Sequence, residues 1–176
     1  MSNRPSAEEY DTSFERYVEL VPEGNIQDLL IQSLQNTIAV FTTVTEDRAN
    51  YRYAPGKWSL KEVLGHITDN ERIMSYRLLR IARGDKTPLA GYDQDILMSG
   101  ASFDTCSLSD LLEEYTVVRR ATLTLLRGLS EEAWSRSGVV NGSESSAAAW
   151  AYIIAGHELH HMNVIHDKYL NEPLPD

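Results

Sequence analysis

Apolar residues recur at helical spacing in four long segments of the chain, and this pattern restricts the possible folds more than any other feature. No comparable stretch alternates between apolar and polar residues with the period of two that a half-buried strand requires. Amphipathic helices of this length can bury their apolar faces against one another in a bundle. The pattern therefore predicts an all-α protein whose core is a four-helix bundle.

The first two helices have recognisable boundaries. The first should run from about Ile26 to Val44, and its apolar stripe consists of Ile26, Leu30, Leu34, Phe41 and Val44. The second opens at "SLKE", where Ser59 and Glu62 have the spacing of a capping box. It continues through "VLGHITDNERIMSYRLLRIAR" and should end at Gly84, because glycine commonly terminates helices.

The remaining two helices are also marked by their flanking residues. The third begins at "SLSD", where Ser107 and Asp110 form another predicted cap. Its apolar positions are Leu108, Leu111, Leu112, Tyr115, Val118, Leu125 and Leu129. The fourth begins after "NGSESS" and should run to about Tyr169, because the following "NEPLPD" contains two prolines.

Two further segments flank or connect these helices. The connection between the second and third helices, "GDKTPLAGYDQDILMSGASFDTCS", is long enough to be a crossover, and long loops in compact domains are often functional. At about residues 8–22, Tyr10, Phe14, Tyr17 and Val21 could form one short amphipathic helix packed on the outside of the bundle. From the length of 176 residues we expect a single domain over 1–176, with the bundle at about 26–170.

Composition and charge argue against several functional classes. A net charge of −10 disfavours binding to phosphate backbones, which depends mostly on Lys and Arg. The longest apolar run, "AAAWAYIIAG", is about half of a membrane span, and "MSNRPSAEEYDTSFERY" lacks the apolar core of a signal peptide. We therefore expect a cytoplasmic protein that binds neither nucleic acid nor membranes. The single cysteine, Cys106, is expected to be a loop or helix-edge thiol.

The distribution of the five histidines suggests a site. Projected at about 100° per residue, the fourth helix presents His157 and His161 on its apolar face, together with Trp150, Ile153, Ile154 and Val164. His160 falls on the flank of this face. His166 projects to the opposite side, where we expect it to be exposed to solvent.

Two buried imidazoles one helical turn apart need partners for their ring nitrogens. A divalent metal would supply one, because residues at i and i+4 can converge on a single ion. The pair of His157 and His160 is also possible at i and i+3, but it ranks second because His160 lies farther from the apolar face. His66, in "VLGHITDNE" of the second helix, is the candidate third ligand. A lone helix histidine is usually a core residue, yet facing helices of bundles can share a metal.

The stretch "HELHH" also matches H-E-x-x-H, the pattern of zinc metalloproteases. The extended form of that pattern needs a glycine and a further histidine, but Val164 and Asp167 occupy these positions. No predicted strand could pair with an extended peptide substrate. We therefore disfavour a protease, and we expect Glu158 to be a solvated carboxylate on the helix surface rather than a general base.

Four other polar residues could orient a ligand or contact a substrate: Asp69, Asn70, Tyr92 and Asp93. Asp69 is more simply explained by an ion pair with Arg72 or Arg77 along its own helix. Trp58 is expected to anchor the start of the second helix by packing. No catalytic residue or general base is assigned.

The chain also resembles a known family. The segment "YRYAPGKWSLKEVLGHITDNERIMSYRLLRIARGDKTPLAGYDQD", followed by "AYIIAGHELHHMNVIHDKYL", resembles the DinB-like superfamily of small bacterial metal-binding four-helix bundles. Relatives include bacillithiol-dependent transferases and mycothiol-dependent isomerases; the DNA polymerase that shares the DinB name is unrelated. The resemblance extends from about Tyr10 to Leu170, and the combination of Trp58, His66 and the His157-to-His161 stretch makes it specific.

The resemblance implies a divalent metal held by one histidine of the second helix and two of the fourth, which match His66, His157 and His161. It also implies that a low-molecular-weight thiol reaches the metal as a thiolate and attacks a small electrophile, as in a stress-response or detoxification transferase. A homodimer is plausible from the family. Many members of the family have no established activity, so the resemblance supports the metal site better than the reaction.

Three neutral imidazoles leave at least one coordination position open, as in catalytic rather than structural metal sites. The open position can lower the pKa of a bound water or hold a thiol deprotonated. Zinc and nickel suit these ligands best, and iron or manganese would also fit. Three hypotheses follow: a metal-dependent thiol S-transferase, a non-catalytic bundle that uses a metal for stability or for binding a ligand or partner, and a metal-dependent hydrolase of a small molecule.

Overall fold

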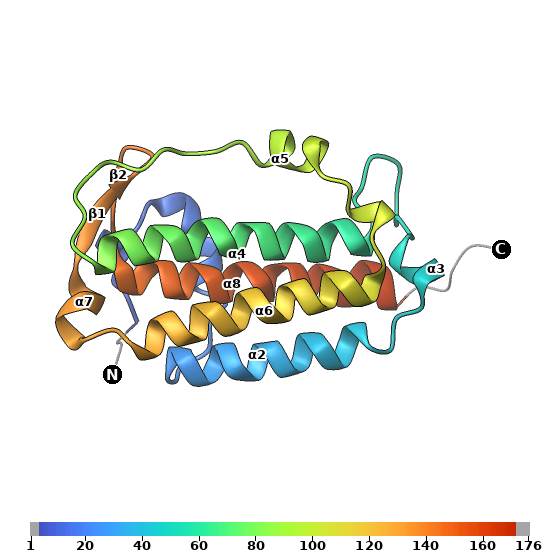
Figure 1. Ribbon diagram of the computed structural model, residues 1–176, viewed down its shortest axis with the longest axis horizontal. Helices are drawn as coiled ribbons and strands as arrows, with labels where there is room; N and C mark the ends of the chain where they lie inside the picture. The colour runs from blue at the N-terminus through green and yellow to red at the C-terminus, as the bar shows by residue number, and fades with distance from the viewer. Residues whose placement is uncertain (1–3, 172–176) are drawn as a thin grey trace.

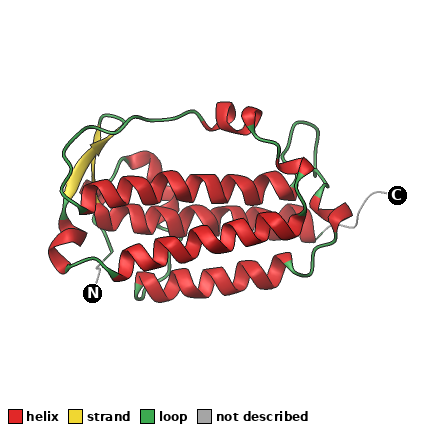
Figure 2. Cartoon of the chain, viewed as in Figure 1, coloured by secondary structure: helices red, strands yellow, loops and turns green. Residues whose placement is uncertain are grey.

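Four long helices lie side by side along the long axis of the molecule (Figures 1 and 2). The computed structural model describes residues 4–171, and its long helices are α2 (Ile26–Phe41), α4 (Leu60–Ala82), α6 (Leu108–Arg127) and α8 (Ala147–Ile165). A π-helical turn over His166–Leu170 prolongs α8, in agreement with the predicted end near Tyr169. The two prolines of "NEPLPD" lie outside the described residues. The prediction of an all-α four-helix bundle is confirmed.

The order of the helices around the bundle explains the long crossover. Helices α2 and α4 each contact both α6 and α8. Figure 1 shows that α4 and α6 run in the same direction, as do α2 and α8. Because α4 and α6 are parallel, their connection must return along the full length of the bundle. It does so beside α4 and contains the short helix α5 (Gln94–Gly100), which confirms the predicted crossover between the second and third long helices.

Local capping sets the helix boundaries much as the sequence predicts. Ser59 and Glu62 form a complete capping box at the start of α4. The side chain of Ser107 accepts a hydrogen bond from the backbone N–H of Asp110 at the start of α6. Helix α2 ends at Phe41, three residues before the predicted Val44. The N–H groups of Thr43 and Val44 bond to carbonyls three positions back, so the chain leaves the α-helix in a tighter turn.

The predicted N-terminal amphipathic helix is wrong in its continuity. Residues 7–18 form two short 3₁₀ turns and the single α-turn α1 (Glu15–Val18). The Asp11 side chain accepts a hydrogen bond from the N–H of Ser13, which starts a new turn in the middle of the segment. The segment nevertheless packs closely on α8: a Cβ placed on Gly156 would lie 1.9 Å from the carbonyl oxygen of Tyr17.

Helix α8 is surrounded by other elements, since α1, α2 and α4 all contact it. Residues 147–158 are buried without exception. The prediction of a solvated Glu158 is therefore wrong, because this side chain is 0% exposed. Helical projection placed Glu158 at the edge of the apolar face, but in this position the edge faces α2 rather than solvent.

A small β-hairpin precedes α8, formed by β1 (Ser137–Val140) and β2 (Ser143–Ser146). Asn141 and Gly142 both have positive φ, as a tight two-residue hairpin turn requires. The strands have only four residues each and are rich in serine, so no alternating apolar pattern marked them in the sequence. The hairpin holds the start of the crossover through hydrogen bonds between Leu89 and the backbone of Val139 and Asn141.

The remaining short helices, α3 (Glu46–Ala49) and α7 (Glu131–Ser135), lie in the connections between the long ones. Among residues 4–171, no helix combines the length and the apolarity that crossing a bilayer requires.

Candidate metal centre

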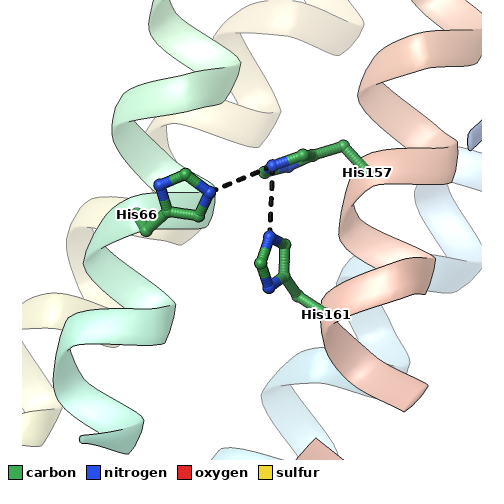
Figure 3. A group of neighbouring side chains, drawn as sticks. All are labelled: His66, His157 and His161. Atoms are coloured by element: carbon green, nitrogen blue, oxygen red, sulfur yellow. Dashed lines mark hydrogen bonds between the residues drawn. The ribbon is translucent and has the colours of Figure 1, made fainter. Parts of the chain in front are cut away.

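Three histidine rings from α4 and α8 point toward one another inside the bundle (Figure 3). The Nε2 atom of His157 lies 3.1 Å from Nε2 of His66 and 3.2 Å from Nε2 of His161. One ring nitrogen of each residue falls within 4.8 Å of the others. The structure thus brings together the three residues that the sequence and the family resemblance singled out.

The spacing of these nitrogens fits a shared metal ion. Ligand nitrogens about 2.0–2.1 Å from a metal, at angles between octahedral and tetrahedral values, are separated by about 2.9–3.4 Å. The separations of 3.1 and 3.2 Å between His157 and its two neighbours fall in this range, and the ligand nitrogens of His66 and His161 lie within 4.8 Å of each other. Three imidazole nitrogens are also a donor set that zinc, nickel and related divalent ions accept. The residues present therefore could hold a divalent metal.

Burial keeps the three imidazoles neutral. His66 and His157 are each 4% exposed, and His161 is half-buried. Desolvation lowers the pKa of His66 to about 4. Burial, with His66, His160 and Arg16 nearby, lowers the pKa of His161 to about 3. Burial, with His161, His66, His160 and Arg16 nearby, holds the pKa of His157 well below its usual range. At neutral pH the ring nitrogens carry lone pairs available to a cation.

Aromatic side chains fix the orientation of these rings. The ring of Trp58 lies 4.8 Å from that of His66, between centroids. The Tyr169 hydroxyl donates a hydrogen bond of 2.6 Å to the Trp58 carbonyl, so the π-helical turn that follows α8 holds Trp58 in place. On the other side, Tyr17 packs edge-on against His157 at 5.3 Å. Trp58 is a packing anchor, as predicted, and it packs directly on a candidate ligand.

The other two histidines lie outside the cluster. His160 packs its ring against Tyr17 and His161, but its nitrogens do not join those of the three converging residues. His166 is exposed, as predicted. The structure therefore brings together the i, i+4 pair of α8 rather than the alternative pair of His157 and His160.

Asn70 completes the inner surface of the site. It lies one turn after His66 on α4, and its Nδ2 is 3.0 Å from Nε2 of His157. Its Oδ1 is buried and has no hydrogen-bond partner within the described residues. An unpaired buried acceptor costs about 1–3 kcal/mol, which points to a donor group that binds beside the histidines. The sequence identified Asn70 as a candidate but assigned it no role.

Glu158 belongs to a buried polar network rather than to the reacting groups. One of its oxygens accepts hydrogen bonds from Thr37 at 2.7 Å and from Tyr115. The other accepts a hydrogen bond from Ser33 and forms an ion pair with Arg119 at 2.8 Å. Burial alone would raise the pKa of Glu158, but the Arg119 charge and these hydrogen bonds lower it below its ordinary value. Both oxygens are occupied, so Glu158 is not a free general base.

Arg119 is the residue of this network that the sequence did not predict. It lies on the buried stripe of α6, is 0% exposed, and pairs with Glu71 of α4 as well as with Glu158 of α8. Its Nη1 also donates a hydrogen bond to the Leu30 carbonyl of α2. All four long helices thus meet at one guanidinium, next to the α8 turn that carries His157.

Two cavities are each lined by one histidine of the cluster. The first, of about 520 Å³, reaches His157 and Asn70 and is also lined by Arg77 and Tyr92. The second, of about 360 Å³, reaches His161 and is lined by Trp58, His160 and Tyr169, among others. Each cavity therefore borders a different member of the cluster, His157 in the first and His161 in the second.

The remaining candidates have mostly structural roles. Asp69 pairs with Arg72 at 3.0 Å, as predicted. Asp93 lines the first cavity, but its side chain caps α5 by accepting from the N–H groups of Asp95 and Ile96. Cys106 is a half-buried thiol at the end of a 3₁₀ turn, in line with its predicted place at a helix edge.

Comparisons with known proteins agree with this architecture. The family model described as "DinB superfamily" matches residues 29–165. Among solved structures, YfiT from Bacillus subtilis is similar, with a TM-score of 0.68 and 16% sequence identity over 94% of this chain and 90% of that chain. YfiT is described as a probable metal-dependent hydrolase with an unusual four-helix bundle topology. None of the curated proteins matches the chain. At this identity the likeness to YfiT concerns the fold.

Proposed function

The chain belongs to the DinB superfamily, and from this membership and the histidine cluster we propose that it is a metal-dependent enzyme. His66, His157 and His161 bind one divalent metal, with zinc or nickel preferred over iron or manganese. The reaction is the transfer of a low-molecular-weight thiol to a small electrophile. In the balanced step, the sulfur loses its proton to solvent and forms a bond to an electrophilic carbon, whose leaving group departs with the bonding electrons.

The observation that supports a two-substrate reaction is the pair of cavities. One cavity is lined by His157 and the other by His161. A transferase needs a place for the thiol and a place for the electrophile, and both must meet at the reacting atoms. Hydrolysis of one small molecule would require a single cavity of this kind.

The residues around the cluster support this chemistry in distinct ways. When bound, the metal supplies a Lewis acid that lowers the pKa of a thiol or water in its open position. Trp58 and Tyr17 hold the rings of His66 and His157 and exclude water from one side of each. Asn70 offers an amide whose unpaired Oδ1 can accept a hydrogen bond from a group bound beside His157.

The proposal is tested by turnover with a panel of thiols and electrophiles. We expect the metal-loaded protein to consume thiol and acceptor in equal amounts, to lose this activity on chelation, and to regain it when zinc or nickel is restored. The His160→Ala variant, which changes a neighbouring histidine outside the cluster, should retain its metal. Metal retained without turnover on any acceptor would contradict the transferase and favour a non-catalytic, metal-stabilised bundle.

Hydrolysis is the second candidate function. YfiT, which shares the fold, is described as a probable metal-dependent hydrolase, and a three-imidazole site with an open position also suits water as nucleophile. The same assays separate the two reactions. Product release that needs metal but no thiol would identify a hydrolase, whereas an absolute requirement for thiol identifies the transferase.

A further inference from the structure

Arg77 is a buried cation without an anionic partner. It is 5% exposed and lies on α4. Its Nη2 donates one hydrogen bond, of 3.0 Å, to the Ala90 carbonyl. Within residues 4–171, no carboxylate forms an ion pair with it. Arg119, the other buried arginine of the bundle, pairs with two carboxylates, so the lack of a partner at Arg77 is unusual for a buried charge.

The guanidinium of Arg77 is held in place by two aromatic rings. It lies 5.0 Å from the ring centroid of Trp150 and 5.3 Å from that of Tyr92. Burial lowers the pKa of Arg77, although an arginine stays protonated in proteins. A guanidinium fixed on two rings, with donors left over, is arranged to bind an anion from outside the chain.

Arg77 shares its cavity with the candidate metal centre. His66, Asn70 and Arg77 lie on one stripe of α4, at helical spacing, and Asn70 and Arg77 line the same cavity as His157. Trp150, beside Arg77, precedes His157 by two turns of α8, which corresponds to about 10 Å along the helix axis. The spacing along α4 from Arg77 to His66 corresponds to about 16 Å, so an anion at Arg77 lies about 10 Å or more from the histidine cluster.

The other charged groups of this cavity are already engaged or exposed. Asp11 accepts hydrogen bonds from the N–H of Ser13 and the hydroxyl of Ser143. Asp93 caps α5. Arg16 is exposed at the rim, where it donates to the Tyr17 hydroxyl. Arg77 is therefore the only buried cation among the residues that line this cavity, and it can neutralise one negative charge. A second negative charge on the ligand would be repelled by the two carboxylates and would meet only the exposed Arg16.

We propose that Arg77 binds the carboxylate of the substrate, and that this substrate is an elongated monocarboxylic acid whose reacting end reaches the histidines. Carboxylate geometry matches a guanidinium through two parallel hydrogen bonds. The distance of about 10 Å or more excludes the smallest acids and requires a chain or ring system between the two ends. The inference rests on the proposed function for the identity of the reacting end, but the binding of the carboxylate does not depend on the metal.

The test compares two probes that differ only in charge: mercaptohexanoate, with a terminal thiol and a terminal carboxylate, and mercaptohexanol, in which a hydroxyl replaces the carboxylate. Dissociation constants are measured by isothermal titration calorimetry on the protein as purified and after chelation. We expect the native protein to prefer the acid by about tenfold or more in both forms. The ratio of the two dissociation constants should fall close to one in Arg77→Met. It should stay at its native value in Arg72→Met, which changes an exposed arginine of the same helix.

The ratio of the two dissociation constants distinguishes recognition of the carboxylate from a structural role of Arg77, because general damage to the cavity weakens the binding of both probes equally. Arg77→Lys, which keeps the charge but loses the two-point geometry, should retain a reduced preference and serves if Arg77→Met does not fold. Equal affinity of the native protein for acid and alcohol overturns the proposal, whatever the variants do. If the protein as purified contains no metal and still prefers the acid, the metal-dependent function is overturned and the role of Arg77 stands.

Discussion

The neutrality of the clustered imidazoles, at the scale of single residues, is a consequence of burial and has a measurable effect. His66 titrates at about 4 in the folded chain, compared with 6.5 for an unperturbed histidine. Between these values the unfolded chain binds a proton that the folded chain does not. The free energy of unfolding of the metal-free protein should therefore decrease as the pH falls from 6.5 toward about 4, by about 3 kcal/mol for this residue.

This pH dependence is measured by urea unfolding of chelated protein, followed by circular dichroism. Other groups also titrate in this range, so the informative quantity is the difference between the native protein and His66→Gln. We expect the variant to lose less stability on acidification. Parallel curves for the two proteins would show that His66 is not held neutral by the fold.

Asn70 allows a second test at this scale. Replacement by leucine, of similar size, removes the amide beside His157 and its unpaired Oδ1. We expect Asn70→Leu to retain its metal and to slow thiol transfer by about tenfold to a hundredfold, without lowering the unfolding free energy of the metal-free protein. The control is Asp69→Ala, which changes a half-buried neighbour of Asn70 and should leave the rate of thiol transfer unchanged. Unchanged rates in Asn70→Leu would remove Asn70 from the reaction.

At the scale of the secondary structure elements, the stability of α8 in the fold depends on contacts with α1, α2 and α4 around the helix. Gly156 permits the N-terminal segment to approach, since a Cβ there would meet the Tyr17 carbonyl at 1.9 Å. We expect Gly156→Ala to lower the unfolding free energy by about 1–3 kcal/mol and to loosen Tyr17 from His157. Thermal unfolding measures the loss of stability, and proteolysis near Glu15 measures the loosening of the N-terminal segment.

The matched control is Gly100→Ala, because a Cβ at Gly100 meets nothing within 4 Å. Equal stability of the two variants would contradict the close packing at Gly156.

The network around Arg119 joins the four long helices and is the second determinant at this scale. Glu158→Gln leaves the buried guanidinium with a single carboxylate, Glu71. Removing one partner of a buried ion pair typically costs about 3–5 kcal/mol. We expect a loss in this range by urea unfolding, with no measurable change in Glu113→Gln, an exposed carboxylate of α6. A loss of less than about 1 kcal/mol, the value typical of surface pairs, would contradict the structural role of Glu158.

At the scale of the whole molecule, the features that the sequence predicts well are those determined locally. The starts of α4 and α6 follow from Ser59 and Ser107, whose caps involve residues only three positions away. The i, i+4 spacing of His157 and His161 likewise needs no knowledge of the fold. His66 could be named only as a candidate from the sequence, and the family resemblance strengthened its assignment. Its 91-residue separation from His157 is closed by the packing of α4 on α8.

The features that the sequence missed depend on which faces become buried together. Glu158 was expected at the surface, because helical periodicity cannot show that α8 would be enclosed by three other elements. Arg119 and Arg77 look like ordinary surface cations in the sequence. Their burial depends on partners from other elements. Arg119 pairs with carboxylates of α4 and α8, and Arg77 packs on the rings of Trp150 and Tyr92.

The central claim is that one metal ion is held by three histidines from two helices, and metal stoichiometry measures it most directly. Elemental analysis of protein purified without chelators should find about one divalent metal per chain. His66→Ala, His157→Ala and His161→Ala should each lose it, while His166→Ala, an exposed histidine at the end of the same helix, should keep it. A native protein without stoichiometric metal, or a His66→Ala variant that retains it, would contradict the account.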